Sequence, residues 1–205
     1  MEERNITITL DKAREWYNSE NESLKEIALQ AFNEEELKFN FRNIKTLEDA
    51  CNALNLDYKN VVIKADYIEL YSKASAAMFK LNIIKKALNL GQDLPFTKNS
   101  KNPIIYCPYN QCVNKNSTLY KDQLKSGKME IIGKIKVGKT ECNILGGDTT
   151  CCYANLGSYG IYNSLVGCAT KEIAKHFSKY FGMTIIEAKY SNLEDFEIIA
   201  NYYKY

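Results

Sequence analysis

IIGKIKVGKTECNIL, residues 131–145, has the pattern of two strands joined by a tight turn. Positions 131, 133, 135 and 137 alternate with Ile132, Lys134 and Lys136, and a period of two is typical of a strand with one face toward a core. Gly138 and Lys139 then suit a two-residue turn into the next strand. This stretch therefore predicts an antiparallel β-hairpin in the C-terminal half of the chain.

Segments on both sides of the hairpin extend the β-rich region. Residues 104–106 favour a strand, and runs bounded by glycine favour two more at 151–153 and 161–162. Thr170 has a side-chain oxygen that suits the start of a long helix. The tail at 193–205 is too apolar for a free end, so we expect it to pack on the fold.

The first half of the chain has a helical pattern. None of the 10 glycines and 3 prolines precedes Gly91, so the usual helix breakers are missing there. Capping residues indicate four helix starts, at Thr9, Ser23 with Glu26, Asn33 with Glu36, and Thr46 with Asp49. We expect the longest helix at 64–90 and a short strand at 61–63. The predicted core residues are Trp16, Ile27, Leu29, Leu54 and Leu81.

These patterns together predict an α+β fold with a helical N-terminal half, a small antiparallel β meander in the C-terminal half, and a C-terminal helix that closes it. We divide the chain into a helical region at 1–91, a linker or loop at 92–103, and a β-rich region with the C-terminal helix at 104–205. The linker is polar and contains Pro95, with Pro103 at its end.

The composition is that of an ordinary globular protein, with 205 residues, 45% of them hydrophobic and 25% charged. The net charge of +2 gives no global excess that would mark nucleic acid as the partner. The N-terminus lacks an apolar signal segment, and no apolar run approaches the roughly 18 residues of a membrane span. We therefore expect a protein kept in a cytosol, without membrane contact, whose seven cysteines are free thiols.

Cysteine and histidine offer little for a metal or catalytic site. Cys107 and Cys112 are spaced C-x4-C and no second tight pair follows, which argues against structural zinc. The single histidine, His176, lies two turns along its predicted helix, so it cannot reach back to Cys168 as the base of a thiol nucleophile. We expect no enzymatic activity, no metal and no cofactor.

Lysine dominates the charge between Gly91 and Thr140, where nine lysines face three acidic residues. Such a surface attracts phosphate, and the candidate nucleic-acid contacts are Lys121, Lys125, Lys128, Lys134 and Lys136. The segment contains no arginine, which is the usual residue for bidentate contacts to bases and phosphates. A solvated lysine face is therefore the favoured interpretation.

Tyrosine is unusually common, with 15 residues. Tyr153, Tyr159 and Tyr162 lie among closely spaced glycines, where a loop can present large rings to a partner. We interpret these three as candidate interface residues. The other interpretation is that their rings pack on the helix that starts at Thr170.

Several stretches near the two ends carry a resemblance. They are ITLDKAREWY at 8–17, LKEIALQAF at 24–32, IKTLEDAC at 44–51, GCATKEIAKHF at 167–177 and EAKY at 187–190. These resemble uncharacterised proteins encoded by phages and prophages of gut Bacteroidales, crAss-like phages among them. The resemblance implies a shared scaffold with a variable central region at 92–166 and a phage context. It implies no catalytic residue, because the matching stretches consist mostly of capping and core residues.

The resemblance, the missing catalytic residues and the tyrosines favour a non-enzymatic phage protein. We expect a virion structural or auxiliary component of the capsid, fibre or tail that acts through protein-protein contacts with other phage or host proteins. The alternative is an intracellular phage factor that binds a host protein or nucleic acid through residues 98–139. A homo-oligomer is left open. The expected location is the host cytoplasm during assembly, and the virion for a structural component.

The tyrosine interpretation predicts the effect of replacing both Tyr159 and Tyr162 by Ala. If these rings anchor a partner, the double variant should bind that partner more weakly by about 2 kcal/mol or more. The melting temperature should change little. If the rings instead pack on the helix after Thr170, the melting temperature falls and the affinity of the folded fraction is unchanged. Measuring both quantities on one variant decides between the two interpretations.

Overall fold

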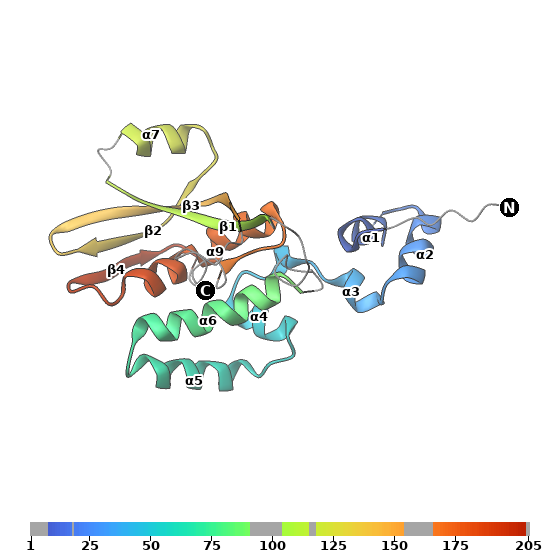
Figure 1. The fold of residues 1–205 in the computed structure, drawn as a ribbon, viewed down its shortest axis with the longest axis horizontal. Coiled ribbons are helices and arrows are strands. Elements are labelled where there is room, and N and C mark those ends of the chain that lie inside the picture. The colour runs from blue at the N-terminus through green and yellow to red at the C-terminus, as the bar shows by residue number, and fades with distance from the viewer. Residues whose placement is uncertain (1–7, 18, 91–103, 115–117, 154–165, 204–205) are drawn as a thin grey trace. The chain divides into compact units, whose positions relative to one another are not determined.

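The computed structural model describes residues 8–17, 19–90, 104–114, 118–153 and 166–203 (Figure 1). The chain divides into two compact units, one formed by Met1–Asn40 with Leu90–Gln92 and the other by Phe41–Asn89 with Asp93–Tyr205. The boundary between Asn40 and Phe41 falls within the predicted helical region at 1–91. The predicted linker at 92–103 lies outside the described residues. Helices precede a four-stranded antiparallel sheet, which confirms the α+β class.

The first unit contains three helices, α1 (Leu10–Tyr17), α2 (Glu22–Ala31) and α3 (Glu34–Lys38). Their shared core consists of Ala13, Ala28 and Leu37, and Trp16 is half-buried against it. The predicted capping box at Asn33 is confirmed, because the Glu36 carboxylate accepts the Asn33 N–H at 3.1 Å. Helix α2, however, is capped by Asn21 rather than by Ser23.

Two predicted core residues of α2 are on the surface. Ile27 is 42% exposed and Leu29 is 46% exposed. The face of α2 that enters the core is centred on Ala28, and Ile27 and Leu29 flank it, about 100° to either side. The prediction for Leu81 in the second unit is confirmed, since it is 1% exposed, and Leu54 is half-buried.

The second unit begins with the 3-10 turn η1 (Phe41–Asn43), followed by helices α4 (Leu47–Ala53), α5 (Tyr58–Glu69) and α6 (Lys73–Leu88). The predicted start of α4 is confirmed. Thr46 Oγ1 accepts the Asp49 N–H at 3.0 Å, and the Asp49 carboxylate accepts the Thr46 N–H at 2.9 Å. Helix α6 packs against both α4 and α5.

The predicted strand at 61–63 and the single helix at 64–90 are both wrong. Residues 61–63 lie inside α5, whose first turn is held by the Asp57 carboxylate through the Lys59 and Asn60 N–H groups. The chain then turns at residues 70–72, and Ser72 Oγ caps α6 by accepting the Ser75 N–H at 3.1 Å. This break lets α5 fold back along α6, and that contact outweighs the β preference of the Val-Val-Ile run.

The sheet consists of β1 (Ile104–Val113), β2 (Glu130–Val137), β3 (Thr140–Tyr153) and β4 (Phe196–Asn201), in the order β1-β3-β2-β4. The predicted hairpin is confirmed, since Val137 pairs with Thr140. The tail also packs as predicted, because β4 pairs with β2. A short helix that the sequence did not predict, α7 (Thr118–Lys125), lies between β1 and β2 along the chain.

Helix α9 (Lys171–Tyr190) lies between the sheet and α6, so the unit is layered as sheet, α9, α6 and α5 (Figure 1). Its predicted start is confirmed, since Thr170 Oγ1 accepts the Ile173 N–H at 3.2 Å. One side of α9 buries Ile186 and Met183 against Ile132, Ile135 and Ile144 of the sheet.

Helix α9 lies close to the sheet because both elements have a glycine at the contact, Gly146 in β3 and Gly182 in α9. A Cβ atom at Gly146 would lie 2.6 Å from the Ser178 carbonyl oxygen, and one at Gly182 would overlap the Asn110 amide and Ile132. Asn110 occupies a register shift in β1, and its Nδ2 donates to the Ser178 carbonyl at 3.0 Å. The glycine inside the helix is therefore a contact point and does not interrupt α9.

This contact predicts that Gly146→Ala destabilises the protein. The added methyl group would meet the α9 backbone, and overpacking of this kind lowers the free energy of unfolding by about 1 to 3 kcal/mol. Gly138→Ala is the matched control, because Gly138 has open space around it and only a left-handed backbone, with φ of 58°. The free energy of unfolding of this control variant should fall by about 1 kcal/mol. Chemical denaturation measures both variants, and a loss at Gly146 no larger than that at Gly138 would contradict the close contact.

Candidate functional site

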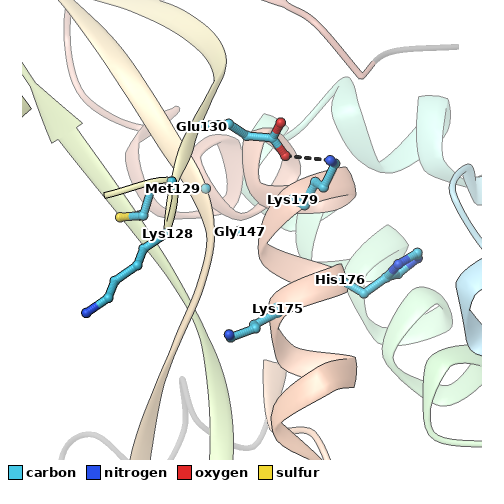
Figure 2. A pocket seen from close by; sticks show the side chains of 9 residues that line it. Lys128, Met129, Glu130, Gly147, Lys175, His176 and Lys179 are labelled. Carbon is cyan, nitrogen blue, oxygen red and sulfur yellow. Dashed lines mark ion pairs between the residues drawn. The ribbon is translucent and has the colours of Figure 1, made fainter. Parts of the chain in front are cut away.

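A pocket of about 350 Å³ lies beside α9, between this helix, the turn that precedes β2 and the middle of β3 (Figure 2). Its lining residues are Gly127, Lys128, Met129, Glu130, Gly146, Gly147, Lys175, His176 and Lys179. Three of these are lysines and one is a carboxylate. We call this site the cationic pocket.

Helix geometry places two of the lysines. Lys175 and Lys179 are four residues apart on α9, so they stand one above the other on the same side of the helix. Between them, Phe177 and Ser178 are fully buried and fix which side of α9 faces the core. The rotation of α9 therefore places both lysines at the pocket, beside the start of β2 and the middle of β3.

The third lysine comes from the chain before β2. Helix α7 ends at Lys125, and Gly127 takes a left-handed backbone with φ of 66°, a conformation that glycine adopts readily. The turn brings Lys128 and Glu130 to the rim, while Met129 is buried in the core. Lys128 and Lys175 thus come from segments almost 50 residues apart in the sequence.

The charges in the cationic pocket do not balance. Lys179 Nζ lies 2.7 Å from Glu130 Oε1 (Figure 2), and this hydrogen bond raises the pKa of Lys179, which keeps it protonated. Within the described part of the chain, no carboxylate forms an ion pair with Lys128 or Lys175. The pocket therefore carries two uncompensated ammonium groups.

His176 lines the pocket, but its ring turns away from the strands toward the helices (Figure 2). Its Nε2 lies 2.6 Å from the Ile44 carbonyl oxygen, to which it donates. The ring packs edge-on against Phe41 and beside Tyr180. Burial lowers the pKa of His176, and the cations of Lys45 and Arg42 lower it further. The imidazole is thus a neutral packing element rather than a base exposed to the pocket.

An aromatic wall stands next to the cationic pocket. Tyr180 and Tyr203 meet edge to face with their centroids 5.2 Å apart, and Lys179 lies 5.5 Å from the centre of each ring. Lys45 lies over the Tyr180 ring, at the edge of a second hollow of about 110 Å³. Burial, and then a hydrogen bond with Glu130, raises the pKa of Tyr203, so its hydroxyl stays protonated.

The structure separates most of the residues that the sequence singled out. Lys121 and Lys125 are exposed on α7, and Lys134 and Lys136 are half-buried on β2, so only Lys128 of this set lines the pocket. Of the tyrosines, Tyr153 ends β3, while Tyr159 and Tyr162 lie outside the described residues.

Sequence reasoning missed Lys175 and Lys179. They fall outside the lysine-rich segment, and their only signal was the four-residue spacing around the single histidine.

The cysteines do not form a catalytic arrangement within the described part of the chain. No described thiol bonds to His176, whose partners are Ile44, Phe41 and Tyr180. Cys168 is fully buried, its thiol donates to the Val166 carbonyl, and burial raises its pKa, which disfavours a reactive thiolate. Among the described residues, no group of three or more His, Cys, Asp and Glu side chains is placed to hold a metal ion.

Comparison with known proteins finds no matching family model, no matching curated protein and no matching solved structure. None of the helices described here combines the length and the apolar character that crossing a membrane requires.

The buried histidine predicts a pH dependence of stability. Because the folded pKa of His176 lies below its ordinary value near 6.5, the unfolded chain takes up a proton first as pH falls. The free energy of unfolding should therefore decrease from pH 7.5 to pH 5.5, with a slope of at most about 1.4 kcal/mol per pH unit. The chain has one histidine, so no other side chain of ordinary pKa titrates in this window.

The variant His176→Gln tests this origin. Glutamine keeps an N–H donor for the Ile44 carbonyl and has no proton to gain, so the slope should flatten over the same pH range. Denaturant unfolding of both proteins at several pH values measures the slope of the free energy of unfolding against pH. An equally steep slope in the variant would assign the effect to another group.

Proposed function

We propose that this chain is a non-enzymatic binding protein of a phage that holds an acidic segment of a partner protein in the cationic pocket. The observation that carries the proposal is the pair of uncompensated ammonium groups at Lys128 and Lys175, beside the Lys179–Glu130 ion pair. Two positive charges at the rim of one pocket favour a ligand that brings two negative charges.

The chemistry of the pocket favours carboxylates on a flexible segment. Lysine presents a compact point charge with three donors on a flexible stem and lacks the planar fork of arginine, so it suits ligands without a fixed bidentate geometry. The existing contact with Glu130 is itself an ammonium-carboxylate pair in this pocket. An acidic side chain of a partner would make the same contact with Lys128 or Lys175.

The proposal of binding rather than catalysis is supported by the state of the reactive groups. His176 is turned away from the pocket and donates to a backbone carbonyl, and the Cys168 thiol is buried. Lys179 is held protonated by Glu130, so it is not a free base. The pocket thus offers charge without a nucleophile or a general base among its described side chains.

The phage context rests on the sequence resemblance near the two ends of the chain. Within that context we propose a structural or auxiliary component of the virion, in which acidic partner segments would come from neighbouring particle proteins. Mass spectrometry of purified particles tests this part alone. Absence of the chain from the particles would refute the virion role and leave the proposed pocket chemistry to its own test.

Nucleic acid is the second candidate ligand, and one observation favours it. Lys121 and Lys125 are exposed on α7, which leads directly to Lys128 at the pocket. Phosphates could therefore contact a longer row of lysines than the pocket alone contains. The two candidates differ in which lysines they require.

The double variant Lys128→Glu with Lys175→Glu tests the proposal. Binding of a fluorescent polyglutamate peptide should weaken at least about tenfold, because two attractive charges become repulsive. The matched control is Lys73→Glu with Lys86→Glu, which changes the net charge equally at exposed sites of α6 outside the pocket. The control should lower the affinity by less than about threefold. Fluorescence anisotropy at constant ionic strength measures both.

Two results would contradict the acidic-segment proposal. One is the absence of polyglutamate binding to the unmodified protein. The other is an equal loss of affinity in the pocket variant and the control. Single-stranded oligothymidylate serves as the parallel probe. Binding of this probe that is lost in Lys121→Glu with Lys125→Glu, in the absence of peptide binding, would assign the lysine surface to nucleic acid instead.

A further inference from the structure

Two cysteines lie side by side on neighbouring strands of the sheet. In β1, Cys112 pairs with Ile144 of β3, and Cys142 lies two residues before Ile144. Side chains two residues apart on a strand project from the same face, so Cys112 and Cys142 are diagonal neighbours across the two strands. Cys142 packs against the buried cluster that contains Ile144, so this is the face that α9 covers.

The two thiols are in direct contact. Although Cys112 as a whole residue is exposed, partial burial of its thiol, and then a hydrogen bond with the Cys142 thiol, raise the pKa of Cys112 to about 12. A hydrogen bond that raises the pKa of a thiol is one in which that thiol is the donor. Cys112 therefore keeps its proton near neutral pH and donates it toward the Cys142 sulfur.

These two thiols are also the accessible ones among the cysteine side chains that the structure describes. Cys51, Cys107 and Cys168 are buried, whereas Cys112 is exposed and Cys142 is half-buried. Cys112 is the second-last residue of β1, which is an end strand in the order β1-β3-β2-β4. A small oxidant can therefore reach the pair from solvent.

We propose that Cys112 and Cys142 are a redox modification site, at which hydrogen peroxide converts the two thiols into a reversible disulfide. The Cys142 sulfur attacks the peroxide, the O–O bond breaks, one water leaves, and Cys142 becomes a sulfenic acid. The Cys112 sulfur then attacks the sulfenic sulfur, and a second water leaves as the S–S bond forms. The two thiols together give up two electrons and two protons, and the peroxide is reduced to two waters.

The order of these steps follows from the protonation of Cys112. A protonated thiol is a poor nucleophile, so Cys142 reacts with the peroxide first and Cys112 acts as the resolving thiol. Charge on the Cys142 sulfur is one of the causes that raise the pKa of Cys112. Once Cys142 is a neutral sulfenic acid, this cause is removed, and Cys112 loses its proton more readily for the second step.

The register predicts a disulfide that is easily reduced. Diagonal neighbours in an antiparallel pair have Cα atoms about 7 Å apart, which is at the upper limit for an unstrained disulfide. The end of β1 must therefore move toward β3 to close the bond, and strained disulfides are the labile ones. We expect reduced glutathione to restore both thiols.

Treatment of the full chain with one equivalent of hydrogen peroxide tests the proposal. The mass should fall by the two hydrogen atoms lost in a disulfide, and the thiols titrated after denaturation should fall from seven to five. Differential alkylation with peptide fragmentation should place the bond between Cys112 and Cys142. Reduced glutathione should restore the original mass and all seven thiols.

The single variants Cys112→Ser and Cys142→Ser separate the two roles. Cys112→Ser lacks the resolving thiol, so dimedone added after peroxide should label Cys142 as a trapped sulfenic acid. Cys142→Ser lacks the sulfur that reacts first, so labelling of Cys112 should be at least about tenfold weaker. The control Cys151→Ser with Cys152→Ser removes the other two cysteines of β3 and should form the disulfide as the unmodified protein does.

Three results would overturn the proposal. They are a thiol count that stays at seven after peroxide, a bond that maps to another pair of cysteines, and equal dimedone labelling of the two single variants. Neither Cys112 nor Cys142 lines the cationic pocket. Loss of the disulfide with normal peptide binding therefore separates this inference from the proposed function.

Discussion

The larger unit depends on the close contact between α9 and the sheet. Gly146 and Gly182 remove the side chains that would hold the helix away, and Asn110 fills the remaining space. Its amide donates to the Ser178 and Leu145 carbonyls, so one side chain ties β1 to both β3 and the helix. Because interiors are packed at crystal-like density, an element held this closely cannot slide or rotate independently of its neighbours. This contact therefore determines how close α9 lies to the sheet.

The rotation of α9 is set by Ser178. Its hydroxyl accepts the Gly147 N–H at 3.0 Å and donates to the Tyr109 carbonyl at 2.7 Å, both in the sheet. Because the Ser178 side chain points into the sheet, Lys175 and Lys179 lie on a neighbouring side of α9, where they line the cationic pocket. The Lys179–Glu130 pair is partly exposed, and such pairs contribute little to stability. The pocket is therefore a consequence of the buried contact and does not hold the fold together.

The unit presents two surfaces of different chemistry. The pocket beside α9 is cationic, and the outer side of α5 is apolar, with α6 packed between the two helices. Helix α6 buries eight of its residues, many of them alanine, and this allows helices to pack closely on both of its sides.

Local interactions made much of the secondary structure predictable. The caps at Thr46 and Thr170 and the turn at Gly138 depend on residues a few positions apart, so the sequence alone determined these boundaries, the α+β class and the hairpin. Only the tertiary structure decided the break at Ser72, which depends on α5 packing against α6, and the place of β1 beside β3. The same holds for the pocket, because Lys128 and Lys175 come to line one pocket only when α9 packs on the sheet. Long-range contacts leave no periodic signal in the chain, and for that reason the site could not be assembled from sequence.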